Sequence, residues 1–308
     1  MTFLTSSVSI GSSLNRLYVI KKDTVSPYES FYVEIVKDVW NSEPVTYRFD
    51  NIDEYVASSS AYTLKFENIA AKEMGDEFRA TIHAFDADGN EYYGPTMASS
   101  MESYLKGVLR NGTTAAQIKM NPLCVDMLNY GAAAQNYFEY NTDELVNADL
   151  TEEELALGTT EIPTYSDTYA TTDTDNVIQI RAKAASFGSK VTMNVVFNVT
   201  NYTGDYNDLV YKVIDEDGSV VASGAVTVSG TTTKTCTVKF DDVAAKKMRS
   251  TYRTGLYEGD TLVSAVQVWN IESYVATIMN GASYKQTMKD LAIATLIYGD
   301  AAAAYLAS

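Results

Sequence analysis

The chain shows the same succession of hydrophobic patterns twice. In each half, the alternation typical of strands comes first and helical spacing follows. Short runs of alternating apolar and polar residues, such as 31–36, predict β-strands in the first half. From Met101 to about Phe138, apolar residues recur at helical spacing in two runs. The second half repeats this order, with alternation from Val177 and helical spacing from Ile271. The pattern predicts two units, each with strands first and a helical pair last.

The two halves also repeat their letters. Residues 66–83 read F-E-N-I-A-A-K-E-M-G-D-E-F-R-A-T-I-H, and residues 240–257 read F-D-D-V-A-A-K-K-M-R-S-T-Y-R-T-G-L-Y. The helical run L-N-Y-G-A-A-A at 128–134 matches L-I-Y-G-D-A-A-A-A at 296–304. A period of about 170 residues is too long for a solenoid unit, so the repeat predicts a duplicated domain.

The predicted fold class is α+β and mostly β. We expect two tandem units, each an antiparallel immunoglobulin-like β-sandwich with a C-terminal helical pair. The expected boundaries are 1–145 for the first unit, 146–175 for an acidic linker, and 176–308 for the second unit. A glycine inside a helix costs about 1 kcal/mol relative to alanine. The glycines at 131 and 299 therefore predict a close approach of each long helix to a neighbour.

Three local features refine the helical segments. Asn68 is expected to cap a short helical turn up to Met74, and Asp242 holds the same place in the second unit. Pro122 is expected to start or kink the long helix of the first unit, because proline is tolerated in the first turn of a helix.

The net charge of −17 lies in the first unit and the linker. Residues 1–148 carry 20 acidic and 11 basic side chains, and residues 149–175 carry eight acidic and no basic ones. Such a surface repels phosphate, so neither nucleic acid nor anionic lipid is expected as a partner. No run approaches the ~18 apolar residues of a membrane span, so no membrane insertion is expected. The chain lacks a signal-peptide pattern, which leaves a cytoplasmic product or a piece of a longer exported chain as alternatives.

No catalytic constellation is apparent. Cys124 and Cys236 fall in different predicted units and are expected to be buried free thiols. His83 is the only histidine, and no G-x-S-x-G or phosphate-binding loop occurs, so His83 is predicted to be an ordinary sheet residue. A carboxylate pair for glycoside hydrolysis cannot be judged from sequence, because its members are separated along the chain. We therefore expect no enzyme activity, no catalytic residues and no cofactor.

Two groups of residues are candidates for binding. Asp86, Asp88 and Asn90 resemble the start of a calcium loop, but they lie between two predicted strands, so a hairpin turn is the preferred interpretation and a calcium site the alternative. Tyrosines occur 23 times, and sugar rings stack on such side chains. The candidate ligand-binding tyrosines are Tyr92, Tyr93, Tyr202 and Tyr206. The preferred interpretation, however, is that these tyrosines seal the contact between strands and helices, with ligand binding as the alternative.

Two segments carry a resemblance to a known family. F-E-N-I-A-A at 66–71 with Met74, and N-Y-G-A-A-A-Q-N-Y-F-E-Y-N-T-D at 129–143, resemble a repeated accessory module of secreted and cell-surface proteins from anaerobic gut Gram-positive bacteria. The second unit is a degenerate copy, in which Ala303 replaces Gln135 and the Y-N-T-D tail is lost. The resemblance implies an extracytoplasmic, non-catalytic accessory role and offers no functional residues to transfer.

The sequence therefore predicts a non-catalytic structural or interaction module of an exported, cell-surface protein. A protein or glycan partner at the cell surface is expected. One alternative is a carbohydrate-binding module that uses exposed tyrosines on one open sheet face. Another is a phage virion surface protein. An unrecognised hydrolase would require a deep cleft with two carboxylates, or His83 beside a serine.

Overall fold

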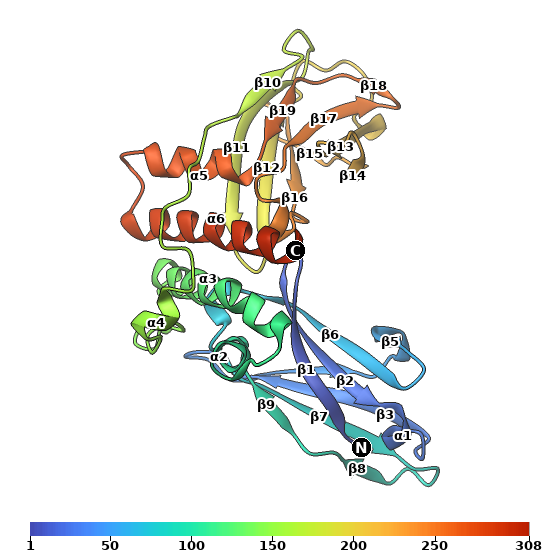
Figure 1. Cartoon of the computed structure of the whole chain (residues 1–308). Coiled ribbons are helices and arrows are strands. Elements are labelled where there is room, and N and C mark those ends of the chain that lie inside the picture. Colours follow the sequence, from blue (N-terminus) through green and yellow to red (C-terminus); the bar gives the residue numbers. More distant parts are fainter. Residues whose placement is uncertain (308) are drawn as a thin grey trace. The chain divides into compact units, whose positions relative to one another are not determined.

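The computed structural model describes residues 1–307, apart from the side chain of Asn68. The chain divides into two units, Met1–Thr160 and a second that begins at Glu161. Strand pairs within the sheets are antiparallel, and a few helices accompany them (Figure 1). The expectation of an α+β fold that is mostly β is confirmed.

Unit 1 contains two sheets that face each other. Phe66 and Phe78 meet across the two sheets with ring centroids 5.3 Å apart. The first sheet has the order β1 (Phe3–Ile10), β2 (Leu14–Lys21), β6 (Ala61–Ile69) and β5 (Tyr55–Ala57). The second has the order β4 (Val45–Phe49), β3 (Ser30–Lys37), β7 (Phe78–Phe85) and β8 (Glu91–Tyr93), and β9 (Met97–Ser99) also pairs with β7.

Unit 2 repeats this strand order and adds one edge strand. Phe240 and Tyr252 meet across its sheets at 5.2 Å, at positions equivalent to Phe66 and Phe78. Its first sheet runs β11 (Gln179–Phe187), β12 (Val191–Asn198), β16 (Thr235–Phe240) and β15 (Val228–Ser229). Its second runs β14 (Val220–Ala225), β13 (Leu209–Ile214), β17 (Tyr252–Glu258), β19 (Val266–Trp269) and β10 (Ala170–Thr172), with β18 (Thr261–Leu262) paired to β17.

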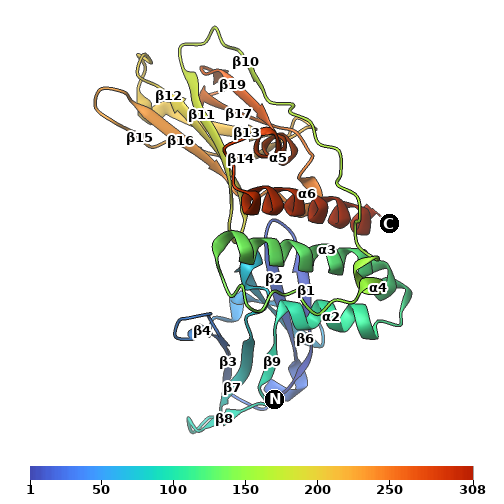
Figure 2. The same cartoon turned by 90° about the vertical axis from the view of Figure 1, so that its left-hand side faces the viewer.

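Each unit ends in two helices, which in unit 1 lie side by side at the end of the sheets away from β8 (Figure 2). Unit 1 has α2 (Met101–Asn111) and α3 (Ala115–Phe138), and unit 2 has α5 (Ile271–Asn280) and α6 (Gln286–Ala307). The short turns are α1 (Lys22–Val25), η1 (Ile52–Glu54), η2 (Ala71–Glu73), α4 (Glu152–Leu155), η3 (Tyr206–Asp208) and η4 (Ala245–Lys247).

The predicted close approach of the long helices is confirmed. A Cβ atom added to Gly131 in α3 would lie 2.8 Å from Val146 Cγ2 and 2.9 Å from Met74 Sδ. A Cβ atom added to Gly299 in α6 would lie 2.8 Å from Met248 Sδ and 3.0 Å from the Ala245 carbonyl oxygen. Both glycines therefore let a helix backbone pack directly on the 3₁₀ turn that follows the first sheet.

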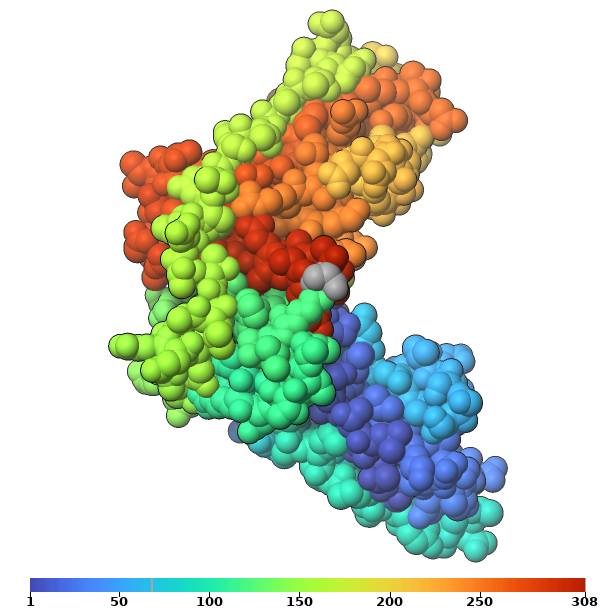
Figure 3. Space-filling view, viewed as in Figure 1, coloured from blue at the N-terminus to red at the C-terminus, as the bar shows by residue number. Residues whose placement is uncertain are grey.

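The expected linker 146–175 is divided between the units instead of standing apart. Val146 and Leu150 are buried in unit 1, and Thr159 donates two hydrogen bonds to Asp126 of α3, at 2.9 and 2.8 Å. Beyond Thr160 the chain runs along the surface of unit 2, where Figure 3 shows it in light green, and it adds β10 to the second sheet. The acidic composition did not reveal that these residues have partners.

Two predicted helix starts, at Pro122 and after Asp242, are wrong, and the alternative of a kink at Pro122 stays a prediction. Thr114 caps α3, since its hydroxyl accepts from the Gln117 amide at 3.2 Å, so the helix starts ahead of Pro122, which lies inside it. The turn η4 has Ala244 rather than Asp242 as its N-cap residue, and it bears no side-chain cap. The predicted Asn68 cap falls on a side chain outside the described residues.

One helix of the described part meets a membrane-span criterion. The α6 window of 18 residues has a mean hydropathy of 1.2, but half of that window is buried within the protein. Buried core helices of soluble proteins pass the same test, so α6 is weak evidence for a membrane span. The expected absence of membrane insertion stays a prediction.

The cysteines are free and buried, as expected. Cys124 lies in α3 of unit 1 and Cys236 in β16 of unit 2. Burial raises the pKa of the Cys124 thiol to about 12 and that of Cys236 to about 11. Neither thiol is available as a thiolate nucleophile in the folded chain.

Candidate functional site

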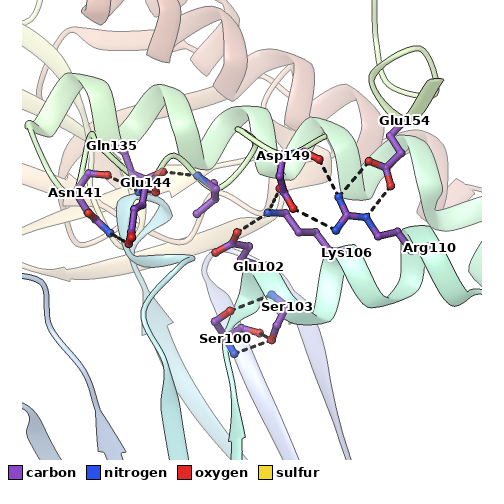
Figure 4. A network of polar contacts seen from close by, with 11 residues as sticks. Ser100, Glu102, Ser103, Lys106, Arg110, Gln135, Asn141, Glu144, Asp149 and Glu154 are labelled. Carbon is purple, nitrogen blue, oxygen red and sulfur yellow. Dashed lines mark hydrogen bonds and ion pairs between the residues drawn. The ribbon is translucent and has the colours of Figure 1, made fainter. Parts of the chain in front are cut away.

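The motif around Gln135 holds the chain that follows α3. The Gln135 amide nitrogen donates to the carbonyl oxygens of Asn141 (3.3 Å) and Glu144 (3.1 Å), and its Oε1 accepts from the Val146 amide at 2.9 Å (Figure 4). These bonds seat Val146 against Gly131. Gln135, which lies in one of the segments that carry the family resemblance, thus attaches the chain after α3 to this helix.

Basic residues of α2 hold the next stretch of chain. Arg110 donates to Glu154 (Nε–Oε1, 2.8 Å) and to Asp149 (Nη1–Oδ2, 3.2 Å), and Lys106 pairs with Asp149 and Glu102 (Figure 4). The hydrogen bond from Lys106 is the main reason that the pKa of Asp149 is lowered, and the bond from Arg110 likewise lowers that of Glu154. These ion pairs help to attach the segment that contains Asp149 and Glu154 to α2 within unit 1.

A buried carboxyl, Asp76, lies beside the turn η2. Tyr140 donates to it at 2.7 Å, and Lys37 Nζ is 4.0 Å from Asp76 and 2.7 Å from Glu73. The Tyr140 hydroxyl also accepts from the Trp40 amide at 3.0 Å. Burial raises the pKa of Asp76 to about 6, although Tyr140 and Lys37 act in the opposite direction.

We expect Asp76 to weaken unit 1 as the pH rises. Because its pKa is raised in the folded state, the folded chain binds more protons than the unfolded chain between about pH 4 and about pH 6. The contribution of this carboxyl to the free energy of unfolding should therefore fall across that window, by on the order of 2 kcal/mol. Urea denaturation of Asp76→Asn at several pH values should show a variant that gains stability relative to the parent above pH 6.

The control for this comparison is Asp88→Asn, because Asp88 is exposed on a hairpin. Its difference from the parent should stay near zero at every pH. A constant difference between Asp76→Asn and the parent from about pH 4 to about pH 7 would contradict the prediction.

The outer face of the second sheet of unit 1 carries a cluster around His83. The His83 ring stacks on Tyr32 with centroids 4.5 Å apart, and its Nδ1 lies 3.0 Å from both the Tyr32 hydroxyl and Glu91 Oε1. Arg48 lies over the Tyr32 ring at 3.8 Å, and Glu34 is 4.0 Å from His83 Nε2. The phenol and the Glu91 carboxylate fix the imidazole, so the cluster ties β8 to β7 and β3.

The Asp86 hairpin uses its carboxylate internally. Asp86 Oδ1 accepts from the amides of Asp88 (3.0 Å) and Asn90 (2.9 Å), and the Asn90 side chain also donates to it. Gly89 adopts a positive φ of 81°. Within residues 1–307, no group of three or more His, Cys, Asp or Glu is arranged to hold a metal ion. The geometry is that of a hairpin turn.

The candidate pair Tyr92 and Tyr93 does not form a flat platform. The two are neighbours in β8, so their side chains point to opposite faces, with 43% and 62% of their surface exposed. Tyr92 lies 5.4 Å from the Tyr28 ring, and Tyr93 lies 4.9 Å from the His83 ring. One open face with coplanar tyrosines is therefore absent from β8.

The pair Tyr202 and Tyr206 is less exposed than expected. Only 8% of Tyr202 is exposed, and its hydroxyl donates to Glu258 at 2.9 Å. Tyr206 is half-buried and lines a cavity of about 560 Å³ in unit 2. Tyr202 thus packs in the unit, and Tyr206 keeps a surface toward a ligand-sized space.

A second cavity, of about 390 Å³, lies in unit 1. Its aromatic lining residues are Tyr28, Phe31 and Tyr62, and the ring centroids of the last two are 5.4 Å apart. Tyr55 contacts both rings, and its hydroxyl donates to the Phe49 carbonyl at 2.6 Å. Lys22 lies over the Tyr62 ring at 4.6 Å. The aromatic contact between the two sheets is thus open to solvent at this place.

Sequence analysis missed this cavity. Tyr62 has the same parity along β6 as the buried Leu64 and Phe66, so alternation alone assigns it to the core. Its partial exposure depends on the path of the loops around it, which the pattern does not encode. The nearby Tyr28–Tyr92 contact is the one link to a predicted residue.

No protein-family model matches this chain, and no curated protein matches it either.

Proposed function

We propose that the chain is a non-catalytic structural or interaction module of an exported, cell-surface protein. It consists of two duplicated immunoglobulin-like β-sandwich units, similar to the repeated accessory modules of gut anaerobic Gram-positive bacteria. A protein or glycan at the cell surface is its partner.

One observation carries the proposal: in both units a long helix presses a glycine onto the turn that follows the first sheet. The polar residues near this contact in unit 1, from Gln135 to Val146, bond to their own chain. The sequence features that both copies retain thus stabilise the fold of each unit. Retention of packing residues, without a shared set of polar groups, favours a scaffold over a duplicated reaction centre.

The experiment is surface labelling of intact producer cells. Antibodies against the purified chain should label cells without permeabilisation, and protease treatment of the cells should remove the label. Labelling that requires permeabilisation would overturn the exported location. Labelling of released particles instead of cells would favour the virion alternative.

Catalysis is tested separately, with a panel of chromogenic glycosides, esters and peptides. The proposal expects no turnover by the purified chain. Turnover that disappears in His83→Ala or Glu34→Gln would assign a reaction to the His83 cluster and contradict a non-catalytic module.

A further inference from the structure

One cavity of unit 1, the one beside Tyr62, occupies a place equivalent to that of the cavity in unit 2. In unit 1, β6 leads at its C-terminal end into η2, which packs on α3, so the start of β6 at Tyr62 lies away from the helices. In unit 2, β16 leads into η4, which packs on α6, so Lys234 just before β16 lies away from them too. Tyr62 lines one cavity and Lys234 lines the other.

The remaining walls also correspond. Each cavity is bounded by the connection from β2 to β3 or its counterpart from β12 to β13, which contribute Glu29 and Asp205 respectively. Each is also bounded by the connection from β4 to β5 or its counterpart from β14 to β15, which contribute Asp50 and Thr227 respectively. The duplicated fold therefore keeps a cavity at the same end of both units.

Both cavities contain an ammonium group over a tyrosine ring, with the two partners exchanged. In unit 1, Lys22 comes from the connection and Tyr62 from β6, at 4.6 Å. In unit 2, Tyr206 comes from the connection and Lys234 from the chain entering β16, at 4.7 Å. The same pair of side chains thus recurs although the positions that supply it differ.

The chemistry of these walls favours a neutral polyhydroxylated ligand. A tyrosine gives an apolar ring edge and a hydroxyl to a sugar, a lysine donates to its hydroxyl oxygens, and a carboxylate accepts from its hydroxyl groups. The lining of the first cavity has one cation, Lys22, and two anions, Glu29 and Asp50, and that of the second has Lys234 and Asp205. Neither lining has the cationic excess that a phosphate or an acidic sugar would need.

We propose that each unit binds a neutral sugar residue of a glycan in this cavity. The proposal rests on the interaction role stated above and names the class of its partner. Volumes of about 390 and 560 Å³ lie within the range of small-ligand pockets. The binding side chains are Tyr62 and Lys22 in unit 1, and Tyr206 and Lys234 in unit 2.

The test is isothermal titration calorimetry of the full chain with neutral hexasaccharides of glucose, xylose and mannose, and with hexagalacturonate as the anionic probe. At least one neutral glycan should bind at two sites per chain with submillimolar affinity. Tyr62→Ala and Tyr206→Ala should each weaken one site by about tenfold or more. The matched control is Tyr93→Ala, an exposed tyrosine outside both cavities.

Tyr62 packs on Phe31 and Tyr55, so Tyr62→Ala also removes contacts inside unit 1. A second variant is therefore needed to separate weaker binding from weaker folding. Asp50→Ala changes an exposed residue of the same wall and should weaken the unit 1 site without lowering the thermal unfolding temperature. Unchanged binding in both Asp50→Ala and Tyr62→Ala would overturn the assignment of that site.

Other outcomes are equally decisive. No binding of any neutral glycan at about 10 mM, tighter binding of hexagalacturonate, or a loss of binding in Tyr93→Ala alone would each overturn the proposal. If surface labelling of cells persists while glycan binding fails, the interaction module survives without its sugar sites. Cleavage of the glycan during titration would contradict the non-catalytic role and leave the binding sites in place.

Discussion

Gly131→Val is expected to destabilise unit 1 by about 3 kcal/mol. The new side chain would enter space already occupied by Val146 Cγ2 and Met74 Sδ, both within 3.0 Å of the position of its Cβ. Val146 is fully buried and β-branched, and Met74 is fully buried, so neither can move without disturbing the core. Urea denaturation of the full chain should show a transition at lower denaturant concentration.

The matched control is Gly107→Ala in α2. No atom lies within 4 Å of the position of a Cβ at Gly107, so alanine should stabilise the helix by about 0.5–1 kcal/mol. Opposite signs for the two variants would separate close packing from helix propensity. A stabilised or neutral Gly131→Val would refute the claim that the helix must approach η2 so closely.

Arg16→Ala should cost about 3–5 kcal/mol, the largest effect expected from a single truncation in unit 1. Arg16 is fully buried and donates to the Ser100 carbonyl at 3.2 Å and to Ser6 Oγ at 2.9 Å. Ser100 is the N-cap residue of α2, so this guanidinium joins the first sheet to the start of the helical pair. Truncation leaves a cavity and removes one donor from the Ser100 carbonyl, which keeps its bonds from the Ser103 hydroxyl and the Tyr104 amide.

Arg16→Met distinguishes the two contributions. Methionine fills much of the space but cannot donate, so its cost should be clearly smaller than that of alanine. Thermal and urea unfolding of both variants check the order. Equal losses for Met and Ala would show that the hydrogen bonds, rather than the filled volume, dominate.

The sequence predicted the features that depend on local spacing. The repeated glycines at 131 and 299 indicated close helix packing because a mid-helix glycine is otherwise unfavourable, and the structure confirms this. The strand that contains His83 and the Asp86 hairpin also follow from alternation and turn chemistry. These features need no knowledge of distant residues.

The features that sequence analysis missed depend on pairings far apart in the chain. Tyr202, in the loop after β12, is buried, and its hydroxyl donates a hydrogen bond to Glu258 at the end of β17. The expected linker is attached at Thr159 because Asp126 lies within reach in α3. The cavity beside Tyr62 exists because two separate connections, from β2 to β3 and from β4 to β5, leave the sheets open there. No window of sequence contains both members of such a pairing.

Each unit contains one buried cysteine, and the reaction of this thiol with an alkylating reagent reports the opening of that unit. A thiol that reacts only after exposure records when its surroundings open, and the two positions belong to different units. Alkylation with iodoacetamide, followed by mass spectrometry of the peptides around Cys124 and Cys236, would yield two separate opening rates in one tube. The opening of each unit can thus be followed separately, without adding a label site or dividing the chain.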